Sequence, residues 1–92
     1  MDMEQATQVA TLGALHACAW LHVKLKLAVW GWDHPGLHPS REVTDRLVDE
    51  SWDFVLALIP GADNPYRALV DQSRVHAKEN VVTLPTARAP KA

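Results

Sequence analysis

The chain has 92 residues, of which 48% are hydrophobic and 22% are charged, and its formal net charge at pH 7 is −2. This composition lies outside the range of low hydrophobicity and high charge that is typical of disordered proteins. The length fits a single domain and leaves little room for a large enzyme cleft. A slightly acidic chain also argues against nucleic-acid binding, because clustered lysine and arginine supply most of that affinity.

The single cysteine, Cys18, bears on the cellular compartment. One cysteine cannot form an internal disulfide, and a lone thiol is typical of a reducing environment. The first residues read MDMEQATQ. They are acidic and polar, whereas a secretory signal is basic and then apolar. We therefore expect a cytoplasmic protein.

A first helix is expected to begin near the N-terminus. Asp2 and Gln5 have the spacing of a capping box, in which each side chain bonds the backbone of the other residue. Apolar residues then recur at steps of three and four as far as about Leu21. This spacing predicts an amphipathic helix.

The stretch 21–30 permits two interpretations. Its odd positions are mostly apolar, while His22, Lys24 and Lys26 occupy even positions. Strict alternation is typical of a half-buried strand. A continuous helix also fits, if the two lysine stems extend along a buried rod until their ammonium groups reach water. We predict the helix, and the alternative is a strand at 21–30 that pairs with 81–84 in an α+β fold.

Residues 31–39 contain two glycines and two prolines and predict a loop. Ser40 follows as the cap of a second helix, which ends before Pro60. Its apolar residues form one stripe that should face the core. The stripe consists of Leu47, Val48, Trp52, Val55, Leu58 and Ile59.

A third helix is expected from Asn64, as the cap, to about Asn80. Pro65 suits its first turn, where a fixed φ is needed and no N–H is required. The predicted fold is therefore mainly α: a three-helix domain over residues 1–80, with a long apolar first helix and an extended C-terminal arm over residues 81–92.

Four possible metal ligands have the spacing C-x3-H-x11-H-x3-H. They are Cys18, His22, His34 and His38, and this spacing is close to the paired spacing of structural zinc sites. Cys18 and His22 would share one face of a helix. The other pair brackets a Pro-Gly loop, where zinc-binding histidines seldom occur. A small zinc-stabilised binding module is therefore the alternative function.

The second helix carries an acidic ridge at Asp45, Asp49 and Asp53, which follow one another at four-residue steps. Like charges so placed repel each other by about 0.2 to 0.5 kcal/mol per pair. The ridge could meet a basic partner, including Arg88 and Lys91 of another copy. The simpler interpretation is a face that contacts only water.

The segment 12–32 is apolar and long enough to span a bilayer. Lys24 and Lys26 make insertion costly and do not form one polar face, so membrane association is the weakest alternative. A helix that is apolar nearly all round is normally buried in a larger body. We therefore expect this segment to contact a protein partner or another copy of the chain.

The predicted interface residues are Leu21, Leu25, Trp30 and Trp32. Tryptophan is a frequent anchor of protein interfaces, since it buries a large area and keeps one polar edge. No serine lies in a glycine-flanked nucleophile turn, and the four glycines are too scattered for a phosphate loop. We therefore expect a non-enzymatic interaction or assembly subunit, or an adaptor, that needs no cofactor.

Overall fold

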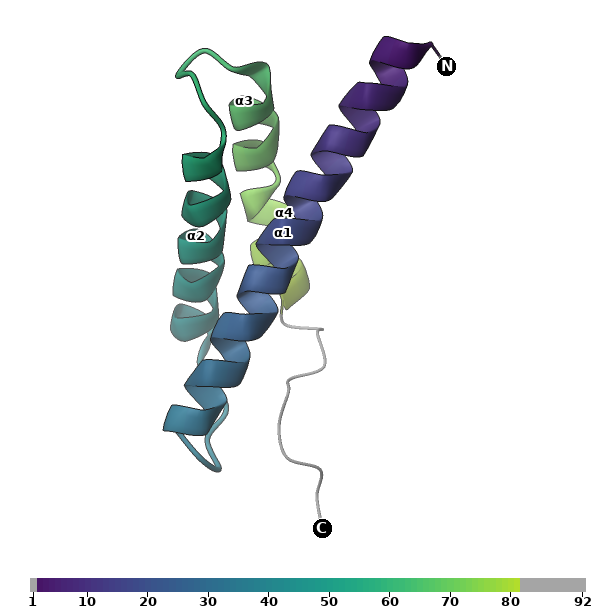
Figure 1. Cartoon of the computed structure of the whole chain (residues 1–92). Helices are drawn as coiled ribbons and strands as arrows, with labels where there is room; N and C mark the ends of the chain where they lie inside the picture. Colours follow the sequence, from purple (N-terminus) through teal and green to yellow (C-terminus); the bar gives the residue numbers. More distant parts are fainter. Residues whose placement is uncertain (1, 82–92) are drawn as a thin grey trace.

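The computed structural model describes residues 2–81, which fold as the predicted arrangement of three helical arms. The arms are α1 (Met3–Asp33), α2 (Arg41–Leu58) and a third arm made of α3 (Pro65–Gln72) and α4 (Arg74–Asn80). Figure 1 shows α2 and the third arm running side by side, with α1 crossing both of them. No strand occurs within residues 2–81, so the mainly α prediction is confirmed.

The start of α1 follows from local hydrogen bonding. The Gln5 amide donates to Asp2 Oδ1 at 2.8 Å, and the Asp2 amide donates to Gln5 Oε1 at 3.3 Å. These bonds complete the predicted capping box and satisfy N–H groups that a helix start leaves without partners. The first turns of α1, up to Ala10, are exposed and diverge from the other arms (Figure 1).

The alternative of a strand over 21–30 is wrong, because all ten residues are helical. In the helix, Val23 is buried while Leu21 and Leu25 are exposed, so burial follows the helical period and not the alternating one. Lys26 Nζ reaches Glu50 of α2 at 3.6 Å. Of the predicted partner strand, 82–84 lie outside the described residues.

The loop prediction for 31–39 needs a correction at its start, because α1 continues to Asp33. The Trp30 carbonyl accepts two hydrogen bonds from His34, one from its amide at 3.0 Å and one at its Nδ1 at 2.8 Å. These bonds close the last turn of α1. Gly36 then adopts a φ of 80°, a left-handed conformation that glycine takes without strain.

The core forms around Trp52 of α2, whose side chain is 1% exposed. Its Nε1 donates to the Val70 carbonyl and to Ser73 Oγ, both at 2.9 Å. Trp20 of α1 meets its ring edge-on, with ring centroids 5.6 Å apart. Trp52 therefore joins all three arms. The other buried core residues are Ala19, Val23, Leu47, Val48, Val55, Ile59, Val70, Ala77 and Val81.

The third arm begins as predicted, with Asn64 Oδ1 accepting from the Tyr66 amide at 3.0 Å, but it is not one helix. It breaks at Ser73 into α3 and α4. Ser73 Oγ donates to the Val70 carbonyl at 2.7 Å and accepts from Trp52. The residue at the break is thus bonded to a tryptophan 21 residues earlier in the chain.

Val81, the first residue of the predicted C-terminal arm, is 4% exposed and packs in the core cluster next to α4. The remainder of that arm, 82–92, lies outside the described residues.

Candidate functional site

The predicted interface residues divide between two sides of α1. Leu21 is 65% exposed, Leu25 58% and Trp32 74%, so these three lie at the surface. Trp30 is half-buried and stacks on His34, with ring centroids 4.1 Å apart. Trp30 therefore belongs to the end of α1 that meets the loop, and the other three mark an exposed face.

This face lies on the side of α1 opposite the core. Ala19 and Val23, the buried residues of α1, point toward α2 and the third arm. At 3.6 residues per turn, the helix turns a second set of residues to the far side. We call this set the outer face of α1, and it consists of Ala14, Cys18, Leu21, Leu25 and Trp32, all of them exposed.

The outer face carries no acidic or basic side chain. Lys24 is exposed beside it, while Lys26 is turned toward Glu50 of α2. Leucine, tryptophan, alanine and cysteine together make an uncharged apolar strip along the helix. Scattered exposed apolar residues are normal on a protein surface, whereas large contiguous apolar patches are typical of interaction surfaces.

By length and composition, α1 is the one helix within residues 2–81 that could cross a membrane, and 11% of its apolar window is buried. Buried helices of soluble proteins and N-terminal signal sequences meet the same criterion. Length and apolarity alone therefore do not assign α1 to a bilayer.

The acidic ridge of α2 is neutralised within the chain. Asp49 Oδ1 lies 3.3 Å from Arg74 Nη1 and 2.9 Å from Lys78 Nζ, and Asp53 Oδ1 lies 2.8 Å from Arg74 Nη2. Asp45 pairs with Arg41 at 3.4 Å. The basic partner of Asp49 and Asp53 is thus α4, which sequence reasoning did not pair with them. Arg88 and Lys91, the partners considered from the sequence, lie outside the described residues.

Arg74 is the centre of this ionic cluster. Burial by itself lowers the pKa of its guanidinium, but the hydrogen bond and charge of Asp53, the charge of Asp71 and the hydrogen bond of Asp49 together raise that pKa above its ordinary value. Arg74 therefore stays charged, and the cluster holds α4 against α2.

The four candidate metal ligands have different surroundings. Cys18 is exposed on the outer face, His22 contacts Ser51, and His34 bonds the Trp30 carbonyl. His38 lies in the exposed loop after α1. No group of three or more His, Cys, Asp or Glu side chains within residues 2–81 is arranged to hold a metal ion. The structure does not bring these four residues together.

His22 of α1 and Ser51 of α2 form a hydrogen bond between the two helices. Ser51 Oγ donates to the Leu47 carbonyl at 2.8 Å, so it accepts from His22 Nδ1, also at 2.8 Å. A catalytic base would have to accept the serine proton instead. The ring of His22 also stacks on Phe54, with centroids 4.5 Å apart. This pair fixes α1 against α2.

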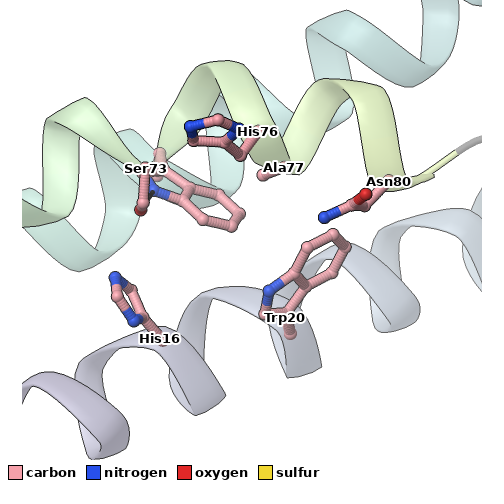
Figure 2. A pocket seen from close by; sticks show the side chains of 7 residues that line it. His16, Trp20, Ser73, His76, Ala77 and Asn80 are labelled. Carbon is pink, nitrogen blue, oxygen red and sulfur yellow. Dashed lines mark hydrogen bonds between the residues drawn. The ribbon is translucent and has the colours of Figure 1, made fainter.

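A hollow of about 140 Å³ lies between α1 and α4. Figure 2 shows His16 and Trp20 on the α1 side, with His76 on the opposite wall. His16 Nε2 is buried and has no hydrogen-bond partner among the described residues. The rest of the lining consists of Trp52, Ser73, Ala77 and Asn80. Sequence reasoning did not single out this hollow, because its lining residues come from distant parts of the chain.

Comparison of the chain with protein-family models, with curated protein sequences and with solved structures finds no match. The fold and the surface define a small, mainly α-helical protein whose longest helix has one face in the core and one apolar face exposed.

Proposed function

We propose that the chain is a non-enzymatic assembly subunit that docks onto a protein partner through the outer face of α1. The observation that carries this proposal is the exposure of Leu21, Leu25 and Trp32 along one uncharged strip. Full burial of a large apolar side chain contributes about 1.5 to 3 kcal/mol. Covering these three side chains would therefore favour association strongly.

A protein surface is favoured over a lipid surface by what packs beside α1. Lys26 of α1 pairs with Glu50 of α2, and the next turn joins His22 to Ser51. If α1 crossed a bilayer in this arrangement, the charges of α2 would lie within the hydrocarbon, where each costs several kcal/mol. A partner protein can cover the outer face and leave these charges in water.

A nucleic-acid partner has little support, because Lys24 is the one basic side chain next to the outer face among the described residues. A catalytic role has little support for a different reason. The nearest candidate for a serine and base pair, His22 and Ser51, is committed to holding two helices together. Both arguments leave protein docking as the function that the geometry supports best.

The test is the Leu25→Asp substitution, with Val75→Asp as its matched control. Both side chains are more than half exposed, at 58% and 63%, but Val75 lies on α4, away from the outer face. In a lysate of the cells that make the protein, we expect the tagged wild type and Val75→Asp to run as a larger particle in gel filtration. Leu25→Asp should run at the size of the free chain, because a buried unpaired carboxylate opposes docking.

Both variants should keep the wild-type circular dichroism spectrum and melting temperature, because neither side chain is in the core. Wild type and Leu25→Asp eluting at the same position, with both chains folded, would contradict the proposed function.

A further inference from the structure

We infer that the outer face of α1 pairs with the same face of a second copy, in antiparallel orientation; this inference rests on the proposed docking function and names its partner. The evidence is a heptad pattern on the side of α1 away from the core. Successive positions are separated by four and three residues in strict alternation. They are Thr7, Thr11, Ala14, Cys18, Leu21, Leu25, Ala28 and Trp32, which we call the heptad seam.

Alternating steps of four and three place a line of side chains along one side of a helix that supercoils with a partner. Six residues of the seam are exposed, and Thr11 and Ala28 are partly buried. The seam therefore runs along the surface of α1 and not into its contact with α2. The helix α1 is only weakly amphipathic, because it is apolar both toward the core and along the seam.

The side chains of the seam are small toward its N-terminal end and mostly large toward its C-terminal end. Its N-terminal half ends in Ala14 and Cys18, and its C-terminal half contains Leu21, Leu25 and Trp32. A parallel pair would place large residues on large ones and small residues on small ones. Voids would remain at the small end, where Ala14 faces Ala14, and voids destabilise a packed interface.

An antiparallel pair centred between Cys18 and Leu21 matches a large residue with a smaller one in three of its four kinds of layer, and the fourth joins two small residues. Cys18 of one copy then faces Leu21 of the other, and Ala14 faces Leu25. The same register places Thr11 opposite Ala28 and Thr7 opposite Trp32. Each of these layers joins the two seam positions of a heptad, as the core of an antiparallel coiled coil requires. The seam is therefore complementary to itself in one orientation.

The charged side chains and the partial charges of the helix ends also favour the antiparallel orientation. The seam holds no acidic or basic residue, so its burial strands no charge. Lys24, which flanks the seam, faces Ala17 of the second copy and not a second lysine. The opposite partial charges of the helix ends also lie side by side in an antiparallel pair. In a parallel pair, like ends would be adjacent.

The size of the contact predicts a reversible dimer. Residues 7–32 span about 39 Å of helix, and a helix about 10 Å wide gives each copy a footprint of roughly 400 Å². This is near half of the roughly 800 Å² per partner of a standard stable interface. The dimer should therefore dissociate on dilution.

The first experiment is sedimentation equilibrium of the purified full chain over a wide range of concentration. We expect a monomer–dimer equilibrium in the wild type and in Val75→Asp. Leu25→Asp should weaken dimerisation by about 30-fold or more, since it introduces an unpaired carboxylate at a central layer. A wild-type chain that stays monomeric at every concentration would overturn the inference.

The orientation is tested by disulfide trapping in a Cys18→Ser background. Ala14→Cys and Leu25→Cys are introduced in separate chains, mixed and oxidised. The antiparallel register predicts a mixed Ala14→Cys and Leu25→Cys dimer and little Leu25→Cys homodimer. A dominant Leu25→Cys homodimer would show a parallel pair and overturn the proposed orientation.

These results distinguish the inference from the proposed function. If the purified chain is a monomer but Leu25→Asp still abolishes the larger particle in lysate, the partner is not a second copy. Docking onto a different protein is then retained. If the purified chain is a monomer and Leu25→Asp has no effect in lysate, both the inference and the proposed function are refuted. Co-flotation of the monomeric chain with phosphatidylcholine vesicles, lost on Leu25→Asp, would also refute both and identify a lipid surface as the occupant.

Discussion

At the scale of single residues, two side chains within residues 2–81 bury a polar atom that has no hydrogen-bond partner there: His16 at Nε2 and Arg74 at Nε. His16 points into the hollow between α1 and α4, and its buried Nε2 has no hydrogen-bond partner among the described residues. A buried polar group without a partner costs about 1 to 3 kcal/mol. The hollow is lined by Trp20, Trp52 and Ala77 together with Ser73, His76 and Asn80, and none of them bonds Nε2, so a side chain without polar atoms would leave no hydrogen bond unmade there.

We predict that His16→Leu raises the free energy of unfolding by about 1 kcal/mol, because it removes the unpaired polar atom and retains most of the packing. The measurement is urea unfolding followed by circular dichroism. His76→Leu is the matched control: its side chain is 81% exposed on the opposite wall of the hollow, so we expect almost no change. A loss of stability in His16→Leu would show that Nε2 has a favourable partner in solution.

Residues whose role is local could be predicted from the sequence, whereas residues whose role depends on distant parts of the chain could not. Asp2 and Gln5 make their capping bonds within one turn, so their spacing alone identified them. Trp52 was identified as core because it lies on the apolar stripe of its helix. The isolation of His16 depends on α4, some sixty residues away, and no local pattern contains that information.

At the scale of elements, the acidic ridge of α2 shows how a neighbouring helix changes the role of a charged face. Asp49 and Asp53 are paired with Arg74 and Lys78, so α4 is held to α2 by ion pairs as well as by Ala77 in the core. The sequence predicted the ridge, but the basic residues of α4 that pair with it were not singled out as its partners. Their pairing is a property of the fold.

We predict that Arg74→Ala lowers the free energy of unfolding by about 2 kcal/mol, because three aspartates lose a shared partner whose side chain is 20% exposed. Arg46→Ala is the control, since its side chain is 61% exposed and lies 3.9 Å from Glu50. We expect a loss of about 0.5 kcal/mol or less there. Equal effects of the two substitutions in urea unfolding would contradict the central role of Arg74.

The same prediction extends to pH. Because the pKa of Arg74 is raised in the folded chain, its contribution is fully present below the ordinary arginine pKa and is lost only as pH rises through the raised value. The difference between wild type and Arg74→Ala should therefore stay constant from about pH 6 to pH 9. A difference that falls within this window would indicate that another group carries the effect.

The ends of the helices could also be predicted where they depend on the local sequence, but not where they involve residues distant in the chain. Ser40 and Asn64 with Pro65 begin α2 and α3 as their local sequence predicts. The break at Ser73 was not predicted, and the side chain at the break bonds Trp52, which is distant in sequence. The two interpretations of 21–30 arose because both sides of that stretch are apolar, one for the core and one for the outer face.

At the scale of the whole molecule, the described arms cover one side of α1 and leave the other exposed. The two shorter arms supply enough side chains to bury Ala19 and Val23, but not enough to enclose a helix of 31 residues. The principal dimensions of 51 × 26 × 19 Å reflect this elongated arrangement. The outer face of α1 is the part of the surface that a partner would complete.

The most direct test of this account uses Cys18, the single native thiol, as a probe on the outer face. Its alkylation rate is measured in the cells that make the protein, before lysis dilutes the chain, and compared between wild type and Leu25→Asp. We predict slow alkylation in the wild type, because the docked partner covers the thiol, and fast alkylation in Leu25→Asp. Equally fast alkylation of both folded chains would show that the outer face is free, and would contradict the central claim.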